Sequence, residues 1–431
     1  MREQSGVFSR KLFVAFSCPL VALLLTVCPL SARGSEAATT KEAAHIDKLD
    51  KAVKALLKKY DIPGATLAVM KVGKLVYAEG YGFSDKGAKE KAKPETLFRI
   101  ASVSKTITAV TTLKLVQEGK LSLDDKAFEI LDDFHPPAGS SPDPRLGLIT
   151  VRDLLRHSGG WVSAEGGDPQ FMSLAIAAAT GCPSPPSPQA VVRYWMGQPL
   201  QNDPGTLYSY SNFGYNVLGR IIEKKTGQSY ESHVLSQILF PAGIRRMQIG
   251  QTLKEQRASG EGTYHPTPAS ALVDSAFPVL GKVPEPYGGW SNEALDSHGG
   301  WIASAVDLMR FVRVVEGSGG QPKLLSDETL ATMTEYQGLP GNGQSPDHYY
   351  ALGWNVDFPG TPQEEWSHTG ALEDCNASLL TRRVDGISYA VLFNSLPSDV
   401  GGFFNEFIPA MRSAVNSVNK WPEKDLFPKH P

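Results

Sequence analysis

Apolar residues recur at three- and four-residue steps in several parts of the chain, and each such run predicts an amphipathic helix. One run covers residues 45–60 and ends before the turn-forming sequence Asp61-Ile62-Pro63-Gly64. A second follows Lys105 and ends at Gly119, which is a typical helix stop. Two further runs, 215–225 and 402–418, predict a helix in the middle of the chain and another near its end.

Alternating or continuous apolar runs lie near both ends of the chain and predict strands. Residues 65–71 and 74–83 read as a hairpin joined by Val72-Gly73, and residues 366–368, 376–383 and 387–394 read as strands near the C-terminus. The pattern predicts an α+β fold: one antiparallel sheet built from both termini with flanking helices, plus a mostly helical inserted domain. We expect a single unit over residues 41–425, with the helical subdomain at approximately 120–300.

The first residues have the pattern of a secretory signal peptide. Arg2, Arg10 and Lys11 precede an apolar run over residues 12–30, and small residues follow. We therefore expect residues 1–37 to be a leader and the protein to be exported, either periplasmic or secreted. An uncleaved anchor is the alternative, and only a retained leader predicts contact with a membrane.

Overall composition indicates a globular protein without an anionic partner. Lys and Arg number 42 against 45 Asp and Glu, for a formal charge of -3, and 41% of residues are hydrophobic. Without a basic excess, nucleic acid is not an expected partner. We expect a small-molecule or peptide substrate, and neither a cofactor nor a metal.

Two of the four cysteines, Cys18 and Cys28, fall in the predicted leader and leave Cys182 and Cys375 in the mature chain. An exported protein can pair two such cysteines. A disulfide between them and a pair of free thiols are the two alternatives.

The strongest chemical signal is a serine three residues before a lysine at a predicted helix start. Ser102 and Lys105 then share one face of the helix, and the lysine amine can accept the serine proton if burial or nearby positive charge lowers its pKa. The helix N-terminus also favours the negative charge that develops during acyl transfer. A simple helix cap at Ser102 is the alternative.

Two more segments carry suitable groups. The loop sequence Tyr208-Ser209-Tyr210-Ser211-Asn212 offers a phenol that can relay protons and an amide that can hydrogen-bond in both directions. The strand-like sequence Trp366-Ser367-His368-Thr369-Gly370-Ala371 contains a glycine that would let a substrate backbone approach closely.

In this order, the three segments resemble the Ser-x-x-Lys, Tyr-x-Asn and Lys-Thr-Gly motifs of the serine β-lactamase and penicillin-binding-protein superfamily. Their flanking sequences resemble its class C-related branch, which includes D-aminopeptidases, carboxypeptidases and esterases. The resemblance implies that Ser102 is the acylated nucleophile and that Lys105 and Tyr210 share the acid-base work. It also implies that Asn212 binds the substrate amide, and that the backbone amides of Ser102 and Ala371 face the oxyanion.

One departure from the motifs changes the expected substrate. His368 stands where β-lactamases usually have lysine, and a histidine is mostly neutral at pH 7. A substrate carboxylate would then lack a fixed cation unless Arg382 or Arg383 supplied one. We expect an exported serine hydrolase of amides or esters, with D-amino-acid peptides, esters or β-lactam-like compounds as substrates. Its substrate-binding residues are the following: Asn212, His368, Thr369, Gly370 and Ala371.

Alternatives to this activity are a penicillin-binding or sensor protein that acylates but barely turns over, and a true class C β-lactamase. Two histidines before glycine-rich turns, His157 and His298, are expected to be structural. The aromatic residues Trp161, Trp290 and Trp301 are candidates either for the lining of the cleft or for packing under loops.

Overall fold

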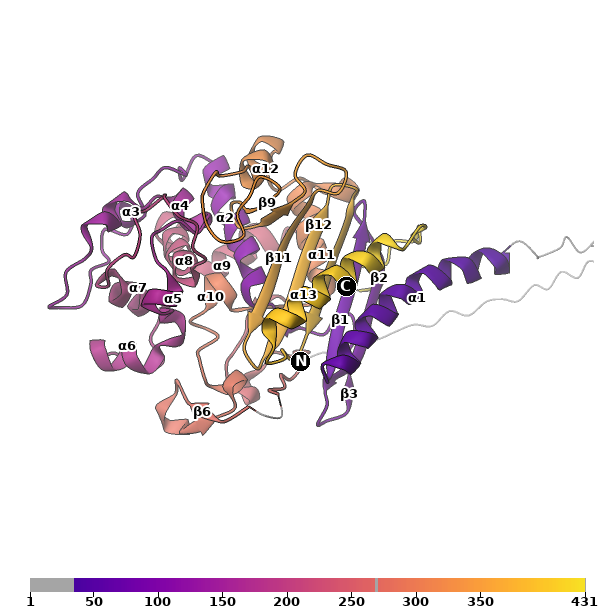
Figure 1. Ribbon diagram of the computed structural model, residues 1–431, viewed down its shortest axis with the longest axis horizontal. Helices are drawn as coiled ribbons and strands as arrows, with labels where there is room; N and C mark the ends of the chain where they lie inside the picture. The colour runs from indigo at the N-terminus through magenta and orange to yellow at the C-terminus, as the bar shows by residue number, and fades with distance from the viewer. Residues whose placement is uncertain (1–34, 268–269, 431) are drawn as a thin grey trace, which may run out of the picture.

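The computed structural model describes residues 35–267 and 270–430, so nearly all of the predicted leader lies outside the described residues. Strands from the two ends of the chain meet in the middle of one eight-stranded sheet, in the order β3-β2-β1-β13-β12-β11-β10-β9 (Figure 1). Its strands are β1 (Gly64–Lys71), β2 (Lys74–Asp85), β3 (Glu90–Lys91), β9 (His348–Tyr350), β10 (Asn355–Asp357), β11 (Glu365–Leu372), β12 (Asn376–Arg383) and β13 (Ile387–Phe393).

The predicted hairpin between β1 and β2 is present, with Val72 and Gly73 as its two loop residues. Both have positive φ angles, 47° and 74°, which is the geometry of the type I′ turn that suits the twist of paired strands. On its other side β1 pairs antiparallel with β13, so that Leu67 faces Val391. The predicted α+β class with an antiparallel sheet built from both termini is therefore confirmed.

One face of the sheet is covered by the first and last long helices, α1 (Ser35–Lys59) and α13 (Val400–Asn416), which lie side by side in Figure 1. Leu49 and Val53 of α1 pack with Phe403 and Phe407 of α13 against the apolar side chains of β1 and β13. The two helices predicted at the chain ends thus share one hydrophobic layer.

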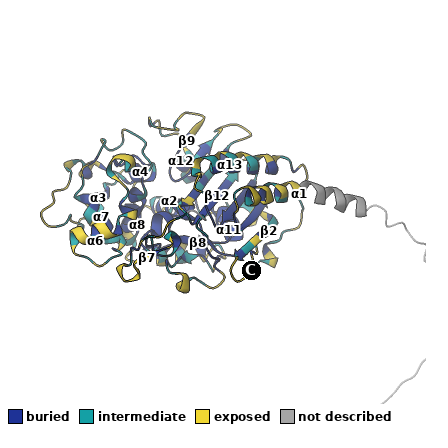
Figure 2. Cartoon of the chain, turned by 60° about the horizontal axis from the view of Figure 1, so that its bottom comes forward, coloured by how far each residue is buried: buried dark blue, intermediate teal, exposed yellow. Residues whose placement is uncertain are grey.

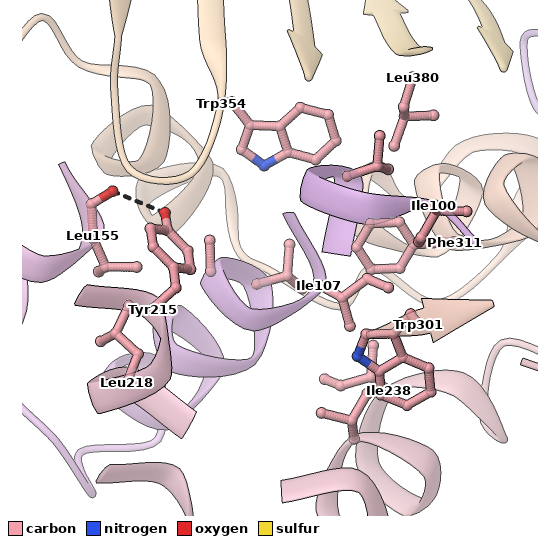
Figure 3. Close-up of a cluster of buried hydrophobic side chains, with 14 of the residues drawn as sticks. Ile100, Ile107, Leu155, Tyr215, Leu218, Ile238, Trp301, Phe311, Trp354 and Leu380 are labelled. Atoms are coloured by element: carbon pink, nitrogen blue, oxygen red, sulfur yellow. Dashed lines mark hydrogen bonds between the residues drawn. The ribbon is translucent and has the colours of Figure 1, made fainter. Parts of the chain in front are cut away.

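The opposite face packs against α11 (Ala305–Glu316) and the nucleophile-bearing part of the chain. Ser304 caps α11, because its hydroxyl oxygen accepts a hydrogen bond from the backbone N–H of Asp307 at 3.0 Å. Figure 3 shows the core between these elements, where Phe311 of α11 lies near Ile100 and Ile107.

The helix after Ser102, α2 (Ser104–Gln117), has the predicted end but not the predicted exposed polar face. Residues 104–113 are buried all round, as the dark blue helix in Figure 2 shows. Threonines make this possible: the hydroxyl of Thr111 donates to the carbonyl of Ile107, and that of Thr112 to the carbonyl of Thr108. These two threonines therefore satisfy their hydrogen bonds inside the helix, and Thr108 does so with Ser297 and Tyr230 of neighbouring segments, rather than in water.

Between α2 and β8 most of the regular elements are short helices joined by long loops, and these helices gather at one end of the sheet (Figure 1). They are α3 (Ala127–Ile130), α4 (Val151–Leu155), α5 (Ser163–Gly166), α6 (Ser173–Thr180), α7 (Pro188–Met196), α8 (Asn212–Thr226), α9 (Tyr230–Val234) and α10 (Asp296–Gly299). Short strands accompany them: β4 (Phe98–Arg99), β5 (Gln248–Ile249), β6 (Val273–Asp274), β7 (Lys282–Val283) and β8 (Trp301–Ala303). A last helix, α12 (Asp327–Thr334), precedes β9.

Both remaining cysteines are free thiols, so the disulfide alternative is wrong. Cys375 is fully buried in the turn between β11 and β12, where a guanidinium nitrogen of Arg99 lies 3.5 Å from its sulfur. Cys182 lies in the proline-rich loop after α6 and is only partly buried.

The three tryptophans considered for the cleft belong to the core instead. Trp161, Trp290 and Trp301 are each exposed by 4% or less. Residue type alone does not separate the two roles, because large aromatic residues serve both. Across the described residues, no helix combines the length and the apolar character needed to cross a membrane.

Candidate active site

Ser102 lies in a tight turn, residues Ala101–Val103, directly before α2. The preceding residue, Ala101, has a left-handed φ of 47° although it carries a Cβ atom. Side chains of β12 hold this turn in place: Asn376 donates to the carbonyl of Arg99 at 2.6 Å, and Ser378 donates to the carbonyl of Ile100 at 2.7 Å. The sheet therefore fixes the position of the serine.

Gly370 makes a close contact that the sequence did not indicate. A Cβ atom added there would lie 2.2 Å from the carbonyl oxygen of Ile100 and 3.2 Å from Cβ of Ala101. The glycine thus makes room for the turn that carries Ser102, and its role toward a substrate backbone stays a prediction. Pairing between β10 and β11 ends at Ser367, and the rest of β11 packs against this turn.

Lys105 is fully buried, and its Nζ lies within hydrogen-bond distance of three oxygens. These are Ser102 Oγ at 3.0 Å, Asn212 Oδ1 at 2.7 Å and the backbone carbonyl oxygen of His298 at 2.9 Å. Burial lowers the pKa of Lys105 to about 7, although the negative charge of Asp168 acts in the opposite direction. The amine is therefore available in its neutral form near neutral pH.

The ring of Tyr210 covers the lysine, with its centroid 4.8 Å from Nζ. Burial holds the pKa of Tyr210 well above 10, and a hydrogen bond with Ser102 offsets only part of this effect. The phenol is therefore protonated while the lysine is neutral.

Asn212 is the first residue of α8, and both ends of its amide are engaged. Its oxygen accepts from Lys105, and its nitrogen donates to Asp168 Oδ2 at 2.6 Å. Burial raises the pKa of the Asp168 carboxyl group. This aspartate precedes a short 3₁₀ turn and was not expected in the site, because nothing in Gly166-Gly167-Asp168-Pro169 distinguishes it from a turn-capping residue.

His368, on β11, is held on both sides of its ring. Its Nδ1 lies 2.6 Å from the carbonyl oxygen of Thr369, so this nitrogen carries the hydrogen and donates. Its Nε2 lies 3.1 Å from the hydroxyl of Tyr350 and therefore accepts. Burial, with a smaller contribution from the charge of Lys105, lowers the pKa of His368 to about 3. The imidazole is neutral and has no N–H left for a substrate.

A cleft of about 450 Å³ opens over these groups, and none of the side chains that line it is ionised at neutral pH. Its lining residues are Ser102, Phe171, Tyr208, Tyr210, Asn212, Tyr350, Asn355, His368, Thr369 and Ala371. The two arginines considered as alternative cations, Arg382 and Arg383, pair with Glu316 and Asp385 at the other end of β12. A larger surface depression of about 700 Å³ beside β3 contains none of the predicted site residues.

The structure thus brings every predicted site residue to one cleft, apart from Gly370, which lies behind it, and Lys105, which lies beneath it. In the part of the chain that the structure describes, no group of three or more His, Cys, Asp or Glu side chains could hold a metal ion. The sequence did not indicate Asp168, nor the lining residues Phe171, Tyr350 and Asn355.

Curated relatives cover most of the chain at low identity. Protein flp of Staphylococcus aureus (strain N315) is 25% identical over 370 residues, which is 86% of this chain but only 66% of that protein. Esterase EstB of Burkholderia gladioli is 27% identical over 389 residues, which is 85% of this chain and 94% of that protein. The second relative therefore matches almost from end to end.

The solved structure of the D-amino acid amidase from Ochrobactrum anthropi SV3 has the same fold, with a TM-score of 0.66 and 22% identity over 86% of this chain and 99% of that one. The named relatives thus include an esterase and an amidase. A family model described as Beta-lactamase matches residues 49–406, and it confirms the resemblance read from the three motifs. The chain belongs to the beta-lactamase family.

Proposed function

We propose that this protein is a serine hydrolase that forms an acyl-enzyme at Ser102 and cleaves uncharged esters or amides. The observation that carries the choice of substrate is the state of His368. Its two nitrogens are occupied by Thr369 and Tyr350, so it offers a substrate neither a positive charge nor a free donor. An uncharged, tyrosine-rich cleft favours an apolar substrate over a carboxylate, which would lose its hydration without gaining a cation.

Lys105 is the proposed base. As a neutral amine it has two N–H bonds, which point to the carbonyl oxygens of Asn212 and His298, and one lone pair, which is left for the hydroxyl of Ser102. When Ser102 Oγ attacks the substrate carbonyl carbon, its proton passes to Lys105 Nζ.

The protonated phenol of Tyr210 is the proposed acid, because it touches Ser102 and stays protonated at neutral pH. It gives its proton to the leaving oxygen or nitrogen as the bond to the acyl carbon breaks, which leaves a phenolate beside the protonated amine of Lys105. The oxyanion faces the backbone amides of Ser102 and Ala371. Water then attacks the acyl carbon and gives its proton to the Tyr210 phenolate, while protonated Lys105 returns a proton to Ser102 Oγ as the bond to the acyl group breaks, so that the acid and the resting enzyme are released.

Support from the relatives is consistent with this chemistry, because EstB is an esterase that matches the chain nearly from end to end. We further propose that the protein is exported, on the basis of Arg2, Arg10, Lys11 and the apolar run that follows them. Sequencing the N-terminus of protein recovered from its native cells tests this: a first residue near position 38 supports export, and an intact Met1 contradicts it.

Intact-protein mass spectrometry during incubation with a short-chain nitrophenyl ester and with a penicillin tests the activity. We expect the ester to be turned over, with a transient acyl adduct that the Ser102→Ala variant does not form. Penicillin should react much more slowly. His368→Lys should improve the kcat/KM for penicillin relative to the ester, because it places a cation beside the cleft.

Three outcomes would contradict the proposal. Undiminished ester turnover by a folded Ser102→Ala variant would show that another group is the nucleophile. A penicillin rate in the wild type that rivals the ester rate would identify a β-lactamase. An adduct that persists for hours with every substrate would indicate a sensor.

A further inference from the structure

His157 is the buried titratable group nearest to the proposed acid that the chemistry above does not use. It follows α4 and has a left-handed φ of 57°, a region in which histidine is less disfavoured than most residues. This conformation turns both its backbone carbonyl and its ring toward the loop that carries Tyr210. The side chain is 1% exposed.

The contacts of His157 lie on either side of Tyr210 in the sequence. Its carbonyl oxygen accepts from the backbone N–H of Ser209 at 2.8 Å, and its Nδ1 accepts from the backbone N–H of Ser211 at 3.2 Å. The imidazole ring lies 4.3 Å, centroid to centroid, from the ring of Tyr210. One residue thus holds the residue before the phenol, the residue after it and the phenol ring itself.

These contacts also fix the protonation of the ring. Because Nδ1 accepts a hydrogen bond, the hydrogen of the neutral imidazole is on Nε2. Nε2 has no hydrogen-bond partner and lies among aromatic rings, whose faces can accept weakly from an N–H. The ring centroids of Tyr350 and Tyr215 are 4.5 Å and 5.1 Å away.

We propose that His157 is the positioning residue that keeps the Tyr210 phenol over Lys105 and Ser102, and that its unprotonated Nδ1 is the atom the site requires. This inference rests on the proposed function. If the acceptor is lost, the backbone N–H of Ser211 is left unpaired and the loop shifts to find another partner. The ring of Tyr210 then uncovers Lys105, and water reaches the amine.

Water at Lys105 gives the inference a specific signature. Burial is the main reason that the pKa of Lys105 is about 7, so hydration moves this pKa back toward its ordinary value of 10.5. The pH at which kcat/KM reaches half its plateau then rises with it. The titratable groups around the imidazole are Tyr208, Tyr210, Tyr215, Tyr350, His368 and Lys105. In the wild type none of them except Lys105 titrates near pH 7, because burial keeps the phenols protonated and His368 neutral.

The test compares His157→Phe, which keeps an aromatic ring and removes the acceptor, with His157→Asn, whose Oδ1 can replace Nδ1 and which tolerates a left-handed φ. His233→Phe is the matched control, because His233 is a buried histidine on α9 outside the cleft lining. The assay measures kcat/KM for a neutral nitrophenyl ester from pH 5.5 to 10, with thermal unfolding to confirm that each variant is folded.

We expect His157→Phe to lower kcat/KM at pH 7 by about 100-fold, as a displacement near 1 Å does in other sites. The midpoint of the rise of kcat/KM with pH, which we call the acid limb, should move from near pH 7 to well above it. His157→Asn and His233→Phe should keep the limb near 7. A wild-type limb in a folded His157→Phe variant would overturn the inference. If that variant does not fold, a raised limb in a folded His157→Asn variant overturns it instead. Wild-type protein that neither hydrolyses nor is acylated by any ester or amide would refute the proposed function itself.

Discussion

Replacing Gly370 by alanine tests the central packing contact of the site. The added Cβ atom would lie 2.2 Å from the carbonyl oxygen of Ile100 and 2.2 Å from Oγ of Ser378, about 1 Å short of ordinary contact. The carbonyl belongs to the backbone and already accepts a hydrogen bond from Ser378 at 2.7 Å, so it cannot rotate away. The turn that carries Ser102 must therefore move away from β11.

Overpacking of this kind typically costs about 1–3 kcal/mol of unfolding free energy. A displacement of about 1 Å at Ser102 should lower kcat/KM by roughly 100-fold. The stability is measured by urea unfolding and the activity with the neutral nitrophenyl ester. We therefore expect Gly370→Ala to lose far more activity than its loss of stability would explain.

Gly401→Ala is the matched control, because no atom lies within 4 Å of the place that an added Cβ atom would take, and the residue lies near the start of α13. There alanine should be neutral or stabilise the protein by up to about 1 kcal/mol, since it favours the helix over the unfolded chain. If Gly370→Ala matched the wild type in both stability and turnover, the tight contact between β11 and the serine turn would not exist, and the reasoning would fail.

Three further predictions follow from single contacts. The pKa of Lys105 is about 7 and the base must be neutral, so kcat/KM should rise tenfold per pH unit below pH 7 and level off above it. A flat pH profile of kcat/KM between pH 5.5 and 8 would exclude this lysine as the base. Thiol titration of the denatured, unreduced mature protein should find two free thiols, Cys182 and Cys375. Ser304→Ala should lower the unfolding free energy by about 1 kcal/mol in urea, because it removes the cap from the N–H of Asp307, whereas Ser304→Thr should retain most of the stability.

The fold was predictable where local pattern and tertiary structure agree. Apolar alternation located β1, β2, β12 and β13, and the two-residue link Val72-Gly73 specified the hairpin between the first two. The burial of α2 could not be read from its pattern, because threonines that bond to their own helix resemble a solvent-facing polar surface in the sequence.

Local geometry alone predicted the site only where its residues are close in sequence, whereas the meeting of Ser102 with Tyr210 and His368 followed from the resemblance to the three motifs. Ser102 and Lys105 lie one turn apart, and their contact follows from helix geometry. Asp168 contacts Asn212 from 44 residues earlier in the chain, and Tyr350 contacts His368 from 18 residues earlier. No local pattern in the sequence indicates either contact. The contact of Gly370 with the serine turn could not be predicted for the same reason, because its neighbour across the contact is Ile100.

The support of Ser102 by β12 has a consequence for the order of events during synthesis. The hydrogen bonds from Asn376 to Arg99 and from Ser378 to Ile100 join residues 277 and 278 positions apart. Contacts of such high sequence separation form late, after the intervening chain has emerged and its loop-closure entropy has been overcome. At bacterial or eukaryotic elongation rates, that chain takes roughly 15 to 55 s to synthesise. Throughout that interval the serine turn lacks the strand that shapes it, so a nascent or truncated chain carries Ser102 and Lys105 without a configured nucleophile.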